Sequence, residues 1–182
     1  LRRVKAGGGN TELLTTPDTA AGELAHWWPQ FLPDGRHVVF TNFSTPIEHA
    51  KIEVLDLQTG ARKVLIEGGV FGRYLPTGQL VYARDETMLA VPFDLRHLAV
   101  TGPAVPVLGD LAMSHSNGEA AFSISQRGDL AYIAASAMNP ETKPLWVARN
   151  GLERPLLTRP GRYAEPALSP DGRRVALTLT DG

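Results

Sequence analysis

Four segments of the chain share a tight turn that ends in glycine and leads into alternating apolar residues. Two copies read Leu-Pro-Asp-Gly-Arg (32–36) and Ser-Pro-Asp-Gly-Arg (169–173), and two degenerate copies read Leu-Pro-Thr-Gly (75–78) and Ser-Gln-Arg-Gly (125–128). Proline fixes φ at the second turn position, aspartate bonds its own backbone, and glycine takes the positive φ that completes a hairpin. The pattern predicts a β-hairpin at each segment.

The spacing of these turns indicates a repeated unit of one size. The turn glycines Gly35, Gly78, Gly128 and Gly172 lie 43, 50 and 44 residues apart, and a four-stranded propeller blade takes roughly 40–50 residues. After the glycine, the alternation begins one residue earlier in the two degenerate copies. We expect their hairpins to be one residue shorter, because a shifted register would turn every side chain to the wrong face.

Each interval also contains two further apolar runs, which predict the third and fourth strands of a blade. They are residues 51–57 and 62–66, 88–95 and 104–108, and 145–148 and 153–157. Pro92, Pro106 and Pro155 fall inside these runs, and proline belongs at a strand edge or a bulge because it has no N–H to donate. No segment shows a sustained helical period. We therefore predict an all-β chain, a β-propeller of four-stranded antiparallel blades that is partial or is completed by oligomerisation.

The repeat divides the chain into one region with five parts. We predict a half blade at 1–16, blades at 17–66, 67–110 and 111–159, and a half blade at 160–182. The first half blade reads as the third and fourth strands, and the last reads as the first and second. We expect both ends to be cuts through a longer repeat.

Composition removes several classes of function. The 18 Lys and Arg residues against 19 Asp and Glu give a formal charge of −1, whereas non-specific nucleic-acid binding relies on a basic surplus. No apolar run approaches the roughly 20 residues that cross a bilayer. The chain has no cysteine, which excludes disulfides, thiolate catalysis and cysteine zinc sites. We expect no nucleic-acid partner and no membrane insertion.

The turns resemble those of TolB-like propeller repeats, relatives of WD repeats with a Pro-Asp-Gly hairpin, and the resemblance covers nearly the whole chain. Residues 92–95 (Pro-Phe-Asp-Leu), 100–103, 105–108 and 145–153 are similar to propellers that follow bacterial serine/threonine protein kinases. The resemblance implies a sensing or scaffolding role and rings of six or more blades. It fits either an extracytoplasmic or a cytoplasmic bacterial location. No kinase motif is present in these residues.

No residue pattern points to catalysis, a metal or a cofactor. Residues 7–9 (Gly-Gly-Gly) are not followed by the Gly-Lys-Ser/Thr of a phosphate loop. The five histidines lack ligand spacing, and His115 between two serines has no Gly-x-Ser-x-Gly elbow beside it. We therefore predict no catalytic residue, no metal and no cofactor, and each of these segments is more simply a loop.

The strongest candidate site is the cluster His26-Trp27-Trp28, which precedes the innermost strand of its blade. In the other repeats the aligned positions begin near Arg73, Glu119 and Glu165. Aromatic and charged side chains at a channel mouth suit a ligand or peptide site, so we predict binding by His26, Trp27, Arg73, Glu119 and Glu165. The alternative is that Trp27 or Trp28 packs between blades.

These observations favour a non-enzymatic propeller that binds a protein, a peptide or a small ligand at the channel mouth. We expect it to be the sensor or interaction part of a larger bacterial protein. A head-to-tail homodimer would complete the ring from the two half blades. The alternatives are the propeller lid of a prolyl-oligopeptidase-like peptidase and a propeller polysaccharide lyase, which clustering of His26 and His115 would support.

Overall fold

The computed structural model describes residues 1–182 except 126, 138–142, 160 and 181–182. Its regular structure is almost entirely β, and the helical elements of the described residues are the 3₁₀ turns η1 (Thr19–Ala21), η2 (Ile47–His49) and η3 (Ala135–Ala137). Across the part of the chain that is described, no helix has the length and apolar character needed to span a membrane.

Three antiparallel sheets of blade type follow one another along the chain. The first contains β3 (Ala25–Phe31), β4 (His37–Phe43), β5 (Lys51–Asp56) and β6 (Arg62–Glu67) in that order. The second contains β7 (Val70–Leu75), β8 (Gln79–Arg84) and β9 (Thr87–Asp94), with its outer position shared by β10 (Ala99–Val100) and β11 (Val105–Leu108). The third contains β12 (Phe122–Ile124), β13 (Leu130–Tyr132), β14 (Leu145–Val147) and β15 (Glu153–Pro155). The predicted fold class is confirmed.

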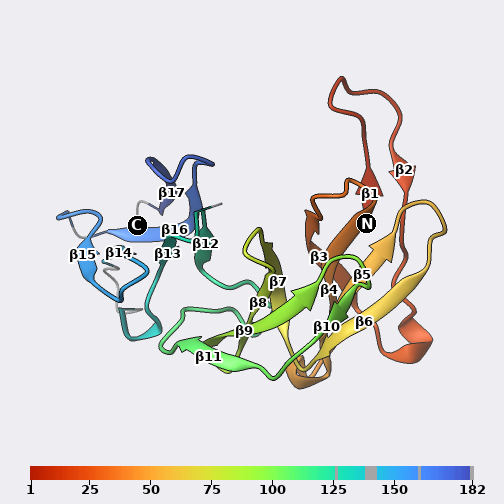
Figure 1. The fold of residues 1–182 in the computed structure, drawn as a ribbon, viewed down its shortest axis with the longest axis horizontal. Helices are drawn as coiled ribbons and strands as arrows, with labels where there is room; N and C mark the ends of the chain where they lie inside the picture. Colours follow the sequence, from red (N-terminus) through yellow and green to blue (C-terminus); the bar gives the residue numbers. More distant parts are fainter. Residues whose placement is uncertain (126, 138–142, 160, 181–182) are drawn as a thin grey trace.

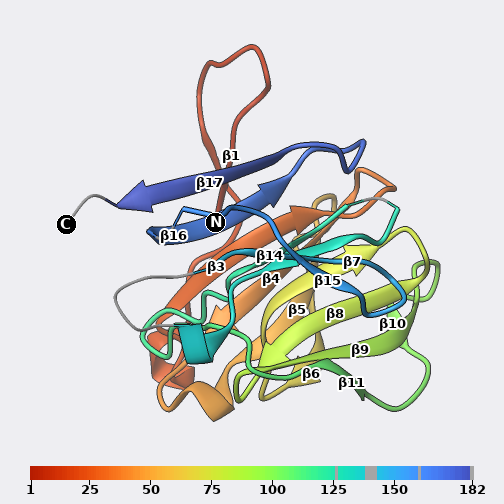
Figure 2. The same cartoon turned by 90° about the vertical axis from the view of Figure 1, so that its left-hand side faces the viewer.

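Two further sheets have only two strands each and lie at the two ends of the array. They are formed by β1 (Arg2–Arg3) with β2 (Glu12–Leu13), and by β16 (Arg162–Leu168) with β17 (Val175–Thr180). Figure 1 shows the sheets following one another along an arc, with β1–β2 at one end and β16–β17 at the other. Figure 2 shows the same arrangement from the side. Among the described residues, the two end sheets do not pair with each other.

All four glycine turns lie in hairpins between the first two strands of their sheets, as predicted. The Leu32 N–H donates to the His37 carbonyl at 2.8 Å, and the Ser169 N–H donates to the Arg174 carbonyl at 2.9 Å. In the degenerate copies the two residues that close the turn are one position closer in the sequence. Leu75 pairs with Gln79, and the Ser125 N–H donates to the Asp129 carbonyl. The prediction of a shorter hairpin is therefore confirmed.

The core lies between successive sheets. Val39, Ile52 and Val54 pack against Leu80 and Tyr82 of the next sheet. A second cluster joins all three of these sheets, and its buried members include Phe43, Val70, Val81, Met88, Leu111 and Phe122. The sheets approach closely at Gly72, where an added Cβ would lie 2.7 Å from Cγ2 of Ile52. Apolar burial between sheets therefore holds each one against the next.

The three prolines that the sequence pattern placed inside apolar runs lie where the ladder needs no donor. Pro106 and Pro155 are on the outermost strands β11 and β15. Pro92 is on β9, which pairs with β11 through residues 88–90 and with β10 through residues 93–94. Pro92 therefore lies at the break in the outer strand, and its carbonyl accepts from the Thr101 N–H at 3.0 Å. Because the outer pairing is interrupted here, no acceptor on a neighbouring outer strand needs the N–H that proline lacks.

Candidate functional site

The first strands of three sheets share a bulge that the sequence pattern did not reveal. The pairing register shifts between Trp27 and Gln30 on β3, between Val70 and Arg73 on β7, and between Ala164 and Ala167 on β16. Within the bulges, Trp28, Phe71 and Glu165 have φ of 58°, 56° and 52°. Each lies seven residues before a turn glycine. A bulge redirects side chains, and non-glycine residues with such φ are often found at functional sites.

Trp28 and Phe71, the aromatic residues of the bulges, form a row with Phe122 that crosses three sheets. The rings of Trp28 and Phe71 have centroids 5.3 Å apart, and those of Phe71 and Phe122 are 5.1 Å apart. The Trp28 indole N–H donates to the Asn117 carbonyl at 3.0 Å. The row connects β3, β7 and β12, so these first strands are neighbours on one side of the array.

A cavity of about 340 Å³ opens beside this row, and we call it the channel cavity. It is lined by residues of the first strands β3, β7, β12 and β16, namely Pro29, Gln30, Phe71, Arg73, Tyr74, Leu75, Phe122, Ser123, Ile124 and Pro166. No lining residue is acidic. Four separate repeats therefore contribute to one cavity, whose walls combine aromatic and aliphatic side chains with polar groups.

Arg73 supplies the positive charge of the channel cavity. Its Nη1 donates to the carbonyls of Trp28 and Gly72, both at 2.9 Å, and its guanidinium carbon lies 4.0 Å from the centroid of the Phe71 ring. Burial lowers the pKa of Arg73 to about 10, so the group is still cationic at neutral pH. None of the ion pairs among the described residues includes it.

Side chains also fix the backbone around the channel cavity. The Gln30 side chain donates to the Tyr74 carbonyl at 3.3 Å and accepts from the Tyr74 N–H at 2.7 Å. The Ser123 hydroxyl oxygen accepts from the Leu168 N–H at 2.9 Å. These bonds join neighbouring first strands that share no ladder, and they satisfy backbone groups that would otherwise be free at the inner edges.

The two acidic candidates, Glu119 and Glu165, lie together and apart from Arg73. Glu119 and Glu165 both line a second cavity of about 340 Å³, whose walls include Ile133 and Tyr163. Glu165 accepts a hydrogen bond from the Thr178 hydroxyl at 2.7 Å. The structure therefore separates the predicted set of residues instead of placing it around one mouth.

The prediction that this cluster precedes the innermost strand is wrong: His26, Trp27 and Trp28 lie within β3, because its pairing with β4 extends back to Ala25. The ring of His26 is buried, with Nδ1 2.8 Å from the Thr15 hydroxyl and Nε2 3.0 Å from Glu23. Burial lowers the pKa of His26. Trp27 packs on Phe43 with ring centroids 4.9 Å apart. Trp28 packs across sheets, against Phe71. This is the arrangement that the alternative interpretation, packing of Trp27 or Trp28 between blades, describes.

His26 also belongs to a polar network that the sequence did not indicate. Arg62 binds Glu23 and Glu53, with Nε 2.8 Å from Oε2 of Glu53. Asn42 donates to both carboxylates at 2.7 Å. Burial opposes ionisation of Glu23, but hydrogen bonds from Arg62, the Asp18 backbone and Asn42 lower its pKa to about 2. The carboxylates of Glu23 and Glu53 are therefore paired with the Arg62 guanidinium inside the fold.

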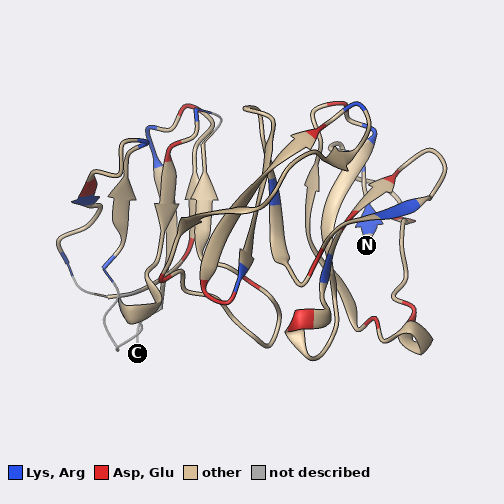
Figure 3. Ribbon diagram, turned by 60° about the horizontal axis from the view of Figure 1, so that its bottom comes forward, with Lys and Arg blue, Asp and Glu red and all other residues tan. Residues whose placement is uncertain are grey.

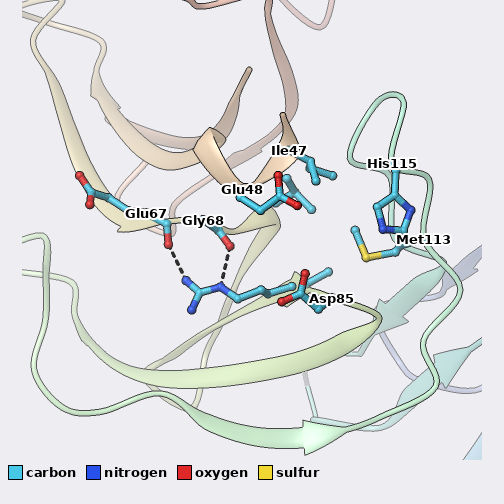
Figure 4. Close-up of a pocket in the computed structure, with 10 residues that line it drawn as sticks. Ile47, Glu48, Glu67, Gly68, Asp85, Met113 and His115 are labelled. Atoms are coloured by element: carbon cyan, nitrogen blue, oxygen red, sulfur yellow. Dashed lines mark hydrogen bonds between the residues drawn. The ribbon is translucent and has the colours of Figure 1, made fainter. Parts of the chain in front are cut away.

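A third cavity, of about 330 Å³, lies between the ends of successive sheets (Figure 4). Ile47, Glu48 and Gly68 line one part of it, while Met113 and His115 lie across from them. Arg84 donates from Nε to the Gly68 carbonyl at 2.6 Å and also to the Glu67 carbonyl. His115 is exposed here, whereas His26 is buried in the network beside Thr15 and Glu23. No group of three metal-ligating residues occurs within the part of the chain described.

Charged residues elsewhere are mixed in sign. Figure 3 shows basic and acidic segments interspersed along the strand ends and connecting loops. The channel cavity differs from this surface because, among the described residues that line it, Arg73 is the only charged one.

Comparison with known proteins identifies the fold. No protein-family model matches the chain, and no curated protein matches it. Among solved structures, TolB from Acinetobacter baumannii superimposes with a TM-score of 0.68 at 17% identity, over 97% of this chain and 42% of that one. A protein named as TolB from Agrobacterium tumefaciens gives 0.63 at 15% identity, over 96% of this chain and 64% of that one.

A protein named as a gluconolactonase gives a TM-score of 0.60 at 15% identity, over 96% of this chain and 62% of that one. The chain thus spans less than two thirds of each of these proteins. At such identities the superpositions establish the fold and not the activity. The chain has the fold of a β-propeller segment similar to that of TolB.

Proposed function

We propose that this chain is a non-enzymatic binding module and that its ligand occupies the channel cavity. The observation that carries the proposal is the convergence of first strands from four sheets on one cavity of about 340 Å³, where polar groups lie beside aromatic and aliphatic side chains. Ligand sites generally combine apolar side chains with placed polar groups and have a volume of roughly 300–1,000 Å³.

The rigidity of the cavity supports the proposal. Gln30 and Ser123 bridge neighbouring first strands, and the Thr41 hydroxyl accepts from the Phe71 N–H at 3.0 Å. A cavity whose wall is already fixed loses little entropy on binding. We infer that the chain serves as the interaction part of a larger protein and takes a peptide segment or a small ligand.

Peptide panning on the purified chain tests this location. Displayed random peptides would be selected on the unmodified chain, and synthetic copies would be titrated against S123W, which fills the channel cavity. V105W is the matched control, because Val105 is 52% exposed on the outer strand β11. We expect S123W to lose peptide binding and V105W to retain it.

The opposite pattern would contradict the location. If the selected peptides bind S123W as well as the unmodified chain, their site lies outside the channel cavity and the proposal fails. Circular dichroism and thermal unfolding of both variants establish that each is folded before the titrations are compared.

We also propose a second copy of the chain as a partner. Among the described residues, β1 pairs only with β2 and β17 pairs only with β16, so each two-stranded sheet has an unpaired edge. Exposed strand edges favour pairing with another chain, and a reciprocal arrangement of two copies would pair both edges. Light scattering should then give twice the 19.7 kDa mass of one chain. A single-chain mass at 100 µM protein would rule out this partner.

A further inference from the structure

The guanidinium of Arg73 is only partly used by the protein. Its two hydrogen bonds to the described residues both leave from Nη1, toward the carbonyls of Trp28 and Gly72. The N–H groups on Nε and Nη2 have no partner among the described residues. These two groups lie side by side, and they are the pair that binds a carboxylate through two parallel hydrogen bonds.

The position of this group makes its charge available to a ligand. Arg73 lines the channel cavity, where the Phe71 ring covers one side of the guanidinium. The two carbonyls and the ring compensate the cation in part, but none of the lining residues carries a negative charge. A desolvated cation interacts more strongly with an anion than an exposed cation does, because the local dielectric is lower.

Two further features of the cavity restrict the chemistry of the anion. Phe71 lies next to the guanidinium, and Phe122 and Ile124 line the same cavity, so that apolar surface is present for an organic group attached to the anion. The Ser123 hydroxyl oxygen accepts from the Leu168 N–H, and its own hydrogen, which has no acceptor among the described residues, can be donated to a ligand. A planar, singly charged group with an apolar neighbour matches this arrangement better than a strongly hydrated dianion.

The geometry points to a carboxylate as the group that the channel cavity recognises, bound by Nε and Nη2 of Arg73 next to the aromatic wall. The inference rests on the proposed function and specifies its ligand. The carboxylate is that of a chain end or of an acidic side chain, and in both cases an apolar or aromatic group adjoins it.

Calorimetric titration with matched acid and amide probes tests the inference on the unmodified chain. N-acetyl-phenylalanine provides a terminal carboxylate, and its amide is the neutral control. N-acetyl-phenylalanyl-glutamate amide and its glutamine analogue make the same comparison for a side-chain carboxylate. We expect the acid of at least one pair to bind about tenfold more tightly than its amide, and the pair that responds identifies the source.

Variants then assign the effect to Arg73. R73M should remove the difference between acid and amide, and R73K should reduce it, because lysine keeps the charge but not the paired N–H groups. R96M is the matched control, because Arg96 lies in an exposed turn. Inorganic phosphate, as a simple anion, should bind more weakly than either acid.

Equal binding of acid and amide to the unmodified chain would overturn the inference, as would an acid preference that survives in R73M, or phosphate that binds as tightly as the acids. The proposed function is judged separately. If peptides from panning lose binding in S123W while acid and amide remain equal, the channel cavity is a binding site but its ligand is not a carboxylate.

Discussion

Two partly buried arginines, Arg62 and Arg73, have opposite surroundings. Arg62 contacts the carboxylates of Glu53 and Glu23, and its pKa lies above the usual value, mainly through the hydrogen bond to Glu53. Arg73 contacts two carbonyls and an aromatic ring, and burial lowers its pKa to about 10. The first cation is neutralised within the fold, whereas the second keeps a charge that the protein does not pair.

This difference separates a structural role from a binding role. Removing one member of a paired, buried network leaves the others uncompensated, so Arg62 is expected to matter for stability. An unpaired buried cation contributes little to stability, and perturbed groups of this kind occur preferentially at functional sites. The predictions below test this contrast, beginning with the largest effect.

Substitution R62M should destabilise the fold by about 3–5 kcal/mol, because it leaves Glu23 and Glu53 without their cation. Urea unfolding at pH 7 measures the change. R3Q provides a control at an exposed ion pair, where Arg3 lies 2.6 Å from Glu12, and should lose at most about 1 kcal/mol. Similar losses in R62M and R3Q would mean that the network is not structural.

Acid should weaken the same network in two steps. The folded-state pKa of His26 is lowered by burial, so unfolded chains take up a proton more readily and stability begins to fall below the ordinary histidine range near 6.5. The pKa of Glu23 is lowered from 4.5 to about 2, so its contribution is present above 4.5 and lost as the pH falls toward 2.

Urea unfolding between pH 7 and pH 2.5 should therefore show a loss of about 1–2 kcal/mol that is attributable to Glu23, because solvent screening reduces the effect of the pKa shift at this partly exposed group. E23Q should lack the lower step and start from a reduced stability at pH 7. The interpretation fails if E23Q follows the same pH profile as the unmodified chain.

Substitution R73M should change stability by no more than about 1 kcal/mol, since the loss of two hydrogen bonds is offset by relief of a desolvated charge. Thermal unfolding next to R62M makes the contrast direct. A loss in R73M as large as that in R62M would assign Arg73 a structural role, and the two arginines would no longer differ in kind.

Much of the fold could be predicted from sequence because its determinants are local. The turns that contain Gly35 and Gly172 combine proline, aspartate and a glycine with φ of 64° and 67°, and each requirement is visible in neighbouring residues. The shorter hairpins at Gly78 and Gly128 followed from the alternation alone. The bulges did not, since Trp28, Phe71 and Glu165 take a left-handed φ that tertiary packing imposes on residues with no such preference.

The candidate site was harder to predict for the same reason. Arg73 was selected by its position in the repeat and lines the channel cavity, but Glu119 and Glu165 line another. Gln30 and Ser123 were not selected, because their role is to bond backbone groups of a neighbouring sheet. The partnership of Arg62 with Glu23 joins residues 39 positions apart, and no local pattern marks such a pair.

The prolines on the outer strands have a consequence for solubility. β11 contains Pro106, β15 contains Pro155, and the outer edge of the β7–β11 sheet is broken opposite Pro92. An unbroken outer edge would offer a row of N–H and carbonyl groups to any extended segment of another molecule, the first step toward fibrous aggregation. With these interruptions, the rims of the two sheets are poor templates for such growth, and we expect an added strand to pair instead at β1 or β17, each of which has an unpaired edge among the described residues.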